Sequence, residues 1–264
     1  MSDHLSVAIH KLTSCSGCQL GFINLGSKLL NVMSFVHFTH FIEAGVYDPD
    51  TPVDVALVEG SVSTEDDLLR LEQVRKNCRW LVTMGACATS GGVQALRNIA
   101  DAQAWKASVY ASPEFVESLD TCTPVAEHVK VDFELWGCPV THEQLIQLLQ
   151  QLRVGVLPKD NSEKVCMACK RSQNVCVMVT HQSPCLGPVV RTGCGALCPS
   201  FGRACFGCFG PSGQANTEGV ANRFEGLGLQ PEAIAQVFAG IHSHQQQHRQ
   251  QIERWRDIPI KEVK

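Results

Sequence analysis

The chain has 264 residues, of which 44% are hydrophobic, so it can bury a sizeable core without disulfide cross-links. Its net charge of -4 and pI near 6.2 argue against nucleic acid as a partner, because nucleic-acid-binding proteins are normally basic. A run of about 18 apolar residues is absent, and the N-terminal residues show neither an export signal nor a twin-arginine pair. We therefore expect a cytoplasmic protein with reduced thiols and no transmembrane segment.

Short apolar runs alternate with helical patterns in the N-terminal part of the chain. The apolar, β-branched runs predict strands at residues 5–12, 53–58, 79–84 and 129–136. The helical patterns lie at about 18–33, 64–77 (with Thr64 as N-cap), 92–103 and 141–152. Residues 34–42, SFVHFTHFI, fit either a further strand or part of an interface with a partner. This alternation predicts an α/β fold with a doubly wound parallel sheet.

The composition changes after Pro158. Cys, Gly and Pro then dominate, with little periodicity until residues 231–256, which predict a terminal helix. Within that helix, IHSHQQQHRQQ at 241–251 fits a solvated face better than a metal site. We place a domain boundary near residue 157.

Four of the fourteen cysteines directly follow predicted strands. Cys15 and Cys18 lie in TSCSGC after the first strand, Cys87 in MGACATSGG, and Cys138 in WGCPVTH. The loops that follow parallel strands emerge at the carboxyl edge of the sheet, where such folds bind ligands. Adjacent glycines allow close approach of the backbone, so that N–H groups can point at sulfur. The pattern predicts one site built from four thiols.

Eight further cysteines fall between residues 166 and 208 and divide into two sets of four. The first set is Cys166, Cys169, Cys176 and Cys185, and the second is Cys194, Cys198, Cys205 and Cys208. Each set contains a CxxC pair and suits either a 4Fe-4S cluster or tetrahedral zinc, which spacing alone does not distinguish. A third four-thiol set on the sheet, surroundings rich in Gly, Pro and Phe, and the lack of a basic surface favour iron. A zinc-binding interaction module is the alternative.

Three residues near these motifs have simpler interpretations. Cys78 ends a predicted helix and Cys122 lies in a predicted loop, so we interpret both as structural. Glu59 ends the 53–58 strand and would lie near the first thiol site. A role in proton transfer or in tuning that site is conceivable for Glu59, but structural hydrogen bonding is favoured.

Five separated motifs resemble, in their order, the small subunit of NiFe hydrogenases. They are TSCSGCQ near the N-terminus, VEGSVST at 58–64, GACATSGG at 85–92, GCP at 137–139 and PCLGPVVRTGC at 184–194. The resemblance extends to about residue 212.

The resemblance implies a flavodoxin-like domain at residues 1–157, followed at 158–264 by an irregular Cys-rich iron-sulfur domain with a terminal helix. A proximal 4Fe-4S cluster would be held in the first domain by Cys15, Cys18, Cys87 and Cys138. A medial 4Fe-4S cluster would be held by Cys194, Cys198, Cys205 and Cys208. A distal 4Fe-4S cluster would be held by Cys166, Cys169, Cys176 and Cys185.

The resemblance also implies that this chain is the electron-transfer subunit of the enzyme. Hydrogen would be cleaved at the nickel-iron site of a separate large subunit, so no catalytic residue is expected here. Electrons would pass from the proximal to the medial and distal clusters, and then to a flavin or iron-sulfur subunit of the diaphorase type. The chain lacks a GxGxxG motif, so no nucleotide site is expected in it.

Two departures from the exported members of that family point to a subgroup. Those members usually carry a histidine where this chain has Cys166 and a proline near Cys198, which makes their medial cluster 3Fe-4S. The all-cysteine sets and the missing twin-arginine signal resemble the cytoplasmic group that reduces NAD(P) or a similar soluble carrier, including the sulfhydrogenases. The alternative is a cluster-bearing subunit of a related respiratory or F420-linked oxidoreductase. CSGC and the eight-cysteine tail disfavour the quinone-linked version.

Overall fold

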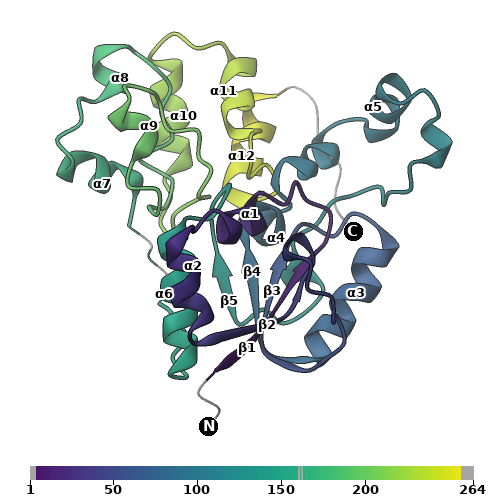
Figure 1. Cartoon of the computed structure of the whole chain (residues 1–264). Helices are drawn as coiled ribbons and strands as arrows, with labels where there is room; N and C mark the ends of the chain where they lie inside the picture. The colour runs from purple at the N-terminus through teal and green to yellow at the C-terminus, as the bar shows by residue number, and fades with distance from the viewer. Residues whose placement is uncertain (1–3, 160, 162, 257–264) are drawn as a thin grey trace. The chain divides into compact units, whose positions relative to one another are not determined.

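The structure, a computed structural model, describes residues 4–159, 161 and 163–256 (Figure 1). The described chain forms two compact units, Met1–Gln94 with Glu114–Asp160, and Ala95–Pro113 with Asn161–Lys264. The break near residue 160 lies close to the predicted boundary at 157, but nothing in the sequence assigned residues 95–113 to the second unit. The outer ends of the two predicted domains, residues 1–3 and 257–264, lie outside the described residues.

A five-stranded parallel sheet with the order β2-β1-β3-β4-β5 forms the centre of the first unit. Its strands are β1 (Leu5–Lys11), β2 (Val36–Phe41), β3 (Val53–Glu59), β4 (Cys78–Met84) and β5 (Phe133–Leu135). The predicted α/β class is confirmed, and the strand order is that of flavodoxin-like folds. Residues 36–41 are therefore a strand, at one edge of the sheet.

Helices cover both faces of the sheet because its strands are apolar on both sides. Val7 and Ile9 of β1 face a core shared with α1 (Gly17–Ile23), α2 (Ser27–Met33) and α6 (His142–Arg153). Ala8, between them, faces the opposite core, to which α3 (Glu65–Lys76) contributes. Figure 1 shows α2 and α6 on one face and α3 on the other.

Local signals explain where several helices begin and end. Thr64 caps α3 as predicted, since its hydroxyl accepts the N–H of Asp67 at 3.1 Å, and Thr141 begins α6 through a second capping box. The predicted helix at 18–33 is instead two helices, because Gly26 between them has a φ of 58°.

Two other expectations were wrong in detail. The predicted strand at 129–136 is reduced to the three residues of β5. The predicted helix at 92–103 is a 3-10 helix (Gly92–Ile99), after which α5 (Ala102–Val109) begins at the N-cap Asp101. Short-range periodicity locates these segments but does not set their ends.

Short helices around a second apolar core form the second unit. They are α7 (Val165–Arg171), α8 (Val177–Thr180), α9 (Leu197–Ser200), α10 (Thr217–Glu225), α11 (Pro231–Phe238) and α12 (Gln246–Trp255). Val189, Phe224, Phe238 and Ile252 lie at the centre of this core. The predicted terminal helix at 231–256 is therefore a hairpin of two helices, α11 and α12.

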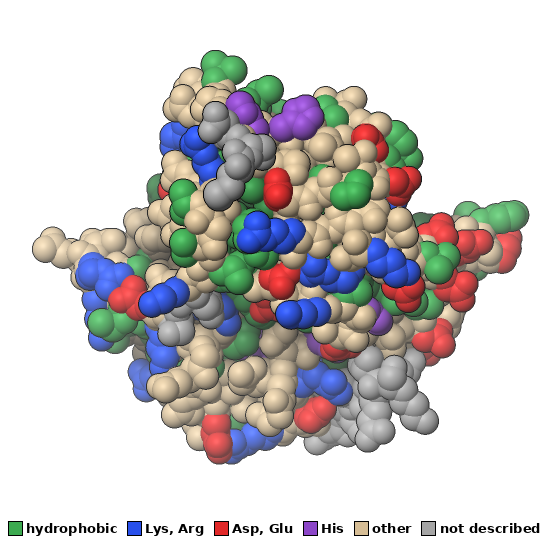
Figure 2. All heavy atoms as spheres, turned by 90° about the horizontal axis from the view of Figure 1, so that it is seen from below, with side chains coloured by type: hydrophobic (Ala, Val, Ile, Leu, Met, Phe, Trp, Pro, Cys, Tyr) green, Lys and Arg blue, Asp and Glu red, His purple; other side chains and the backbone are tan. Residues whose placement is uncertain are grey.

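The surface carries charges of both signs. Figure 2 shows one face, on which Lys and Arg side chains lie among Asp and Glu side chains. None of the helices in the described part of the chain combines the length and apolar composition needed to cross a bilayer.

Candidate metal centres

Cys15, Cys18, Cys87 and Cys138, here called the sheet-edge set, all follow the carboxyl ends of strands. Cys15 follows β1, Cys18 lies in α1, Cys87 lies in α4 (Gly85–Ser90) directly after β4, and Cys138 follows β5. Their thiols lie near enough to interact electrostatically. Burial, and then charge on Cys138 and Cys15, raise the pKa of Cys87 to about 12. Burial, followed by Glu59, Cys87 and Cys138, also raises the pKa of Cys18.

Glycines shape the backbone around these sulfurs. Gly85 has a φ of 87°, and a Cβ at this position would overlap the Cys18 Sγ. A Cβ on Gly92, at a φ of 62°, would lie 2.8 Å from the Cys87 Sγ. The backbone thus approaches the sulfurs where a side chain would not fit.

Glu59 is a buried carboxylate at the end of β3 that holds the first cysteine loop. Its Oε1 accepts the N–H of Cys18 at 3.0 Å, and its Oε2 accepts the N–H of Gln19 at 3.3 Å. Only 2% of the Glu59 side chain is exposed. The predicted structural hydrogen bonding of Glu59 is confirmed, and its charge also lies close enough to raise the pKa of Cys18, Cys87 and Cys138.

Gln94 also belongs to this site, although no sequence motif singled it out. Its Oε1 lies 3.4 Å from the Cys87 Sγ, and its Nε2 donates to the carbonyl of Thr13 at 3.1 Å. Gln94 therefore links the loop after β1 to α4. The only signal was its position two residues after the SGG turn.

Cys166, Cys169, Cys176 and Cys185, the Cys166 set, come together in the second unit. Burial, and then charge on Cys185, Cys169 and Cys176, raise the pKa of Cys166 to about 11. A Cβ on Gly187 would lie 3.4 Å from the Cys166 Sγ and 3.5 Å from the Cys185 Sγ. The other three thiols predicted to form this set therefore lie near enough to act on Cys166.

Cys194, Cys198, Cys205 and Cys208 form the Cys194 set. Burial raises the pKa of Cys205 most, and charge on Cys185, Cys208 and Cys194 raises it further. Cys198 lies at the second position of α9, four residues after Cys194, and its assignment to this set rests on spacing.

A hydrogen bond joins the Cys166 set and the Cys194 set. The backbone N–H of Cys205 donates to the Sγ of Cys185 at 3.2 Å, and the N–H of Leu186 donates to the carbonyl of Cys205 at 3.0 Å. The two sets are therefore in direct contact through Cys185 and Cys205, although 20 positions separate these residues.

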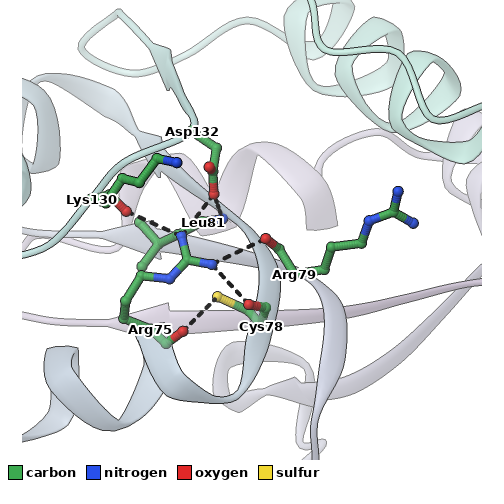
Figure 3. Close-up of polar contacts among 6 residues, drawn as sticks. All are labelled: Arg75, Cys78, Arg79, Leu81, Lys130 and Asp132. Carbon is green, nitrogen blue, oxygen red and sulfur yellow. Dashed lines mark hydrogen bonds and ion pairs between the residues drawn. The ribbon is translucent and has the colours of Figure 1, made fainter.

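The two remaining cysteines, Cys78 and Cys122, contact backbone carbonyl groups. Cys78 begins β4, where it was expected to end a helix, and so lies at the opposite end of that strand from α4. Its Sγ lies 3.8 Å from the carbonyl oxygen of Arg75 (Figure 3). The Arg75 side chain donates to the Cys78 carbonyl at 2.8 Å and pairs with Asp132 at 2.7 Å. Cys122 is fully buried, with its Sγ 3.4 Å from the carbonyl of Gly91.

The donor chemistry of the three sets fits iron-sulfur clusters. Burial raises the pKa of their inner thiols, so thiolates there would be costly without a positively charged partner. Iron is such a partner, and backbone N–H groups supply hydrogen bonds to sulfur: those of Cys205 and Gly187 to Cys185, and that of Gly207 to Cys205. Within the described ranges, no three His, Cys, Asp or Glu side chains are spaced to hold a single metal ion.

Comparisons with known proteins place these cysteines in context. Residues 15–152 match the family described as NADH ubiquinone oxidoreductase, 20 Kd subunit. The chain is 37% identical over 216 residues to sulfhydrogenase 2 subunit delta of Pyrococcus furiosus, covering 82% of this chain and 90% of that protein. It is 28% identical over 166 residues to the NAD-reducing hydrogenase HoxS subunit delta of Cupriavidus necator, covering 57% of this chain and 79% of the relative.

A solved structure shows the same relationship in three dimensions. A chain of an NAD+-reducing NiFe hydrogenase in its H2-reduced state superposes with a TM-score of 0.53 at 30% sequence identity. The superposition covers 60% of this chain and 95% of that chain.

Proposed function

The chain belongs to the family of the NADH ubiquinone oxidoreductase 20 Kd subunit, as a homologue of hydrogenase small and delta subunits, and we propose that it conducts electrons within a NiFe hydrogenase. It would connect the nickel-iron site of a large subunit to a soluble acceptor module through three 4Fe-4S clusters. One observation carries this proposal: buried thiols gather at three places, around Cys87, Cys166 and Cys205.

Each set would hold one cluster by its four thiolates. The sheet-edge set would hold the proximal cluster, the Cys194 set the medial cluster and the Cys166 set the distal cluster. When bound, a 4Fe-4S cluster supplies reversible one-electron storage whose potential depends on charge, hydrogen bonds to sulfur and burial. The chain controls all three of these properties. Glu59 adds negative charge beside the sheet-edge set, and the Cys205 N–H donates to a sulfur of the Cys166 set.

The electron acceptor is proposed from the relatives. Their names include a sulfhydrogenase and an NAD-reducing hydrogenase, so we favour a diaphorase-type flavin or iron-sulfur partner that reduces NAD(P). A coenzyme F420 hydrogenase subunit gamma of Methanococcus voltae is 30% identical over 166 residues, which keeps an F420-linked complex as the second candidate. The chains that copurify with the tagged protein would distinguish the two. The cytoplasmic location stays a prediction.

Iron analysis tests the number of clusters. Once the iron and sulfide of the partner subunits are subtracted, anaerobically purified complex should contain about twelve iron atoms and about twelve sulfides per copy of this chain, since three clusters each hold four of both. Stoichiometric zinc, or only about four iron atoms per chain, would contradict the assignment. The same preparation should contain a large subunit that binds nickel, because all twelve thiols of the three sets would bind iron.

A second test concerns the charge of Glu59. Glu59→Gln removes a buried negative charge next to the sheet-edge set, so the midpoint potential of the proximal cluster should rise because added electrons meet less repulsion. A redox titration followed by electron paramagnetic resonance (EPR) measures this change.

Asp54→Asn is the matched control for Glu59→Gln. Asp54 is a carboxylate at the other end of β3 that accepts the N–H of Ser6 at 2.9 Å. We expect Asp54→Asn to leave the midpoint potentials of all three clusters unchanged. Equal shifts in the two variants, or no shift in Glu59→Gln, would show that the charge of Glu59 does not act on the cluster.

A further inference from the structure

Two histidines that the sequence placed on a solvated helix face are buried in the second unit. His242 is 1% exposed and His248 is 2% exposed. The expectation for residues 241–251 was wrong because the chain forms a hairpin there. His242 lies in the turn between α11 and α12, and His248 lies on the inner side of α12. Their rings meet edge to face with centroids 6.4 Å apart, and His248 also packs on Phe238 at 5.5 Å.

His242 makes a hydrogen bond to a cysteine of the Cys194 set. Its Nε2 lies 3.0 Å from the carbonyl oxygen of Cys208, 34 positions earlier in the chain. A carbonyl oxygen only accepts hydrogen bonds, so the imidazole must carry its proton on Nε2 and donate it. The helical hairpin thus contacts the backbone of a candidate ligand residue directly.

The loop that carries Cys208 is also fixed on its other sides. The ring of Phe209 packs so closely on Gly193 that a Cβ on this glycine would overlap the ring. The N–H of Gly210 donates to the carbonyl of Gly207 at 2.9 Å, which closes a turn around Cys208. Within this turn, the Cys208 carbonyl points to His242. The orientation of the peptide that follows the thiol therefore depends on a residue of the C-terminal hairpin.

We propose that His242 is a positioning residue for the medial cluster, and that the α11–α12 hairpin supports the Cys194 set as well as the core. Through its hydrogen bond to the carbonyl, His242 holds the Cys208 backbone in the orientation that directs the thiolate toward the cluster. The proposal rests on the proposed function, since it requires that the Cys194 set hold a cluster. It gives residues 213–256, beyond the hydrogenase-like motifs, a role in tuning electron transfer.

The test is a redox titration followed by EPR on the whole complex, prepared anaerobically. His242→Phe keeps an aromatic ring but removes the donor, so one of the three cluster signals should change its g-values. Its midpoint potential should fall, because the loss of an N–H dipole leaves more negative charge near the cluster. His242→Gln should restore both properties, because its side-chain amide can donate from a similar place. If His242→Phe does not assemble, His242→Met removes the donor with a more flexible side chain.

His248→Phe is the matched control, since it makes the same substitution in the same hairpin. The ring contacts of His248 are with His242 and Phe238. We expect His248→Phe to leave the EPR signals of all three clusters as they are in the unmodified complex. Equal spectral changes in His242→Phe and His248→Phe, no change in His242→Phe, or no rescue by His242→Gln would overturn the proposal. Failure of the proposed function would be visible separately, as missing clusters in the unmodified complex.

Discussion

Replacing Gly85 by alanine is expected to remove about four iron atoms per copy of this chain from the complex, since one of the chain's three clusters would be lost. Gly85 has a φ of 87°, where an L-residue is strained, and its new Cβ would overlap the Cys18 Sγ. The methyl group and the sulfur cannot both keep their positions. The thiolate would therefore be displaced from the proximal site, while the Cys166 and Cys194 sets in the second unit keep their ligands.

Gly26→Ala separates this effect from backbone strain. Gly26 also has a positive φ, of 58°, but a Cβ there meets no heavy atom within 4 Å. Gly26→Ala should therefore lower the stability of the chain through backbone strain, while the complex keeps its full iron content. Iron and sulfide analysis, together with EPR of the reduced complex, measure both variants. Full iron content with an unchanged proximal signal in Gly85→Ala, or equal iron loss in Gly26→Ala, would contradict the prediction. Either result would show that a side chain at residue 85 does not displace the Cys18 thiolate from the cluster.

Replacing Cys198 by proline should convert the medial cluster from 4Fe-4S to 3Fe-4S. Cys198 is the second residue of α9, in the first turn, where proline is tolerated because the N–H groups there have no helical acceptor. The change removes one thiolate, so one iron would lose its anchor. The new centre should have a higher reduction potential, because the type and charge of a cluster set its potential. Electrons would then be held at the medial position, which slows the reduction of a low-potential acceptor such as NAD(P) more than that of a high-potential dye.

EPR of the oxidised variant detects the new 3Fe-4S signal, and Cys78→Ser is the control. Cys78 lies at the beginning of β4, where its surroundings are Arg75 and Asp132 rather than other thiols (Figure 3). Its loss should leave every cluster signal unchanged. If Cys198→Pro produces no such signal, or if Cys78→Ser has the same effect, then the division of the eight C-terminal cysteines is wrong.

The sequence alone was sufficient to predict the parallel α/β sheet and the edge at which Cys15, Cys18, Cys87 and Cys138 lie. Both follow from short-range patterns, because each of these cysteines directly follows an apolar strand and parallel strands end at one edge. The CxxC spacing likewise predicted that Cys166 lies near Cys169 and that Cys205 lies near Cys208. The ligation of clusters by these thiols stays a prediction that the iron analysis tests.

Only the tertiary structure showed what surrounds the sulfurs. Three hydrogen bonds were not evident from the sequence: that between Cys87 and Gln94, that from the Cys205 N–H to the Cys185 sulfur, and that from His242 to the Cys208 carbonyl. The polar residues of 241–251 suggested a solvated face, and the hairpin of α11 and α12 buried two of their histidines instead. The last two hydrogen bonds join residues 20 and 34 positions apart, so their formation depends on how whole segments pack. Local propensity carries no information about such packing, whereas it does indicate that a strand lies before each cysteine loop at the edge of the sheet.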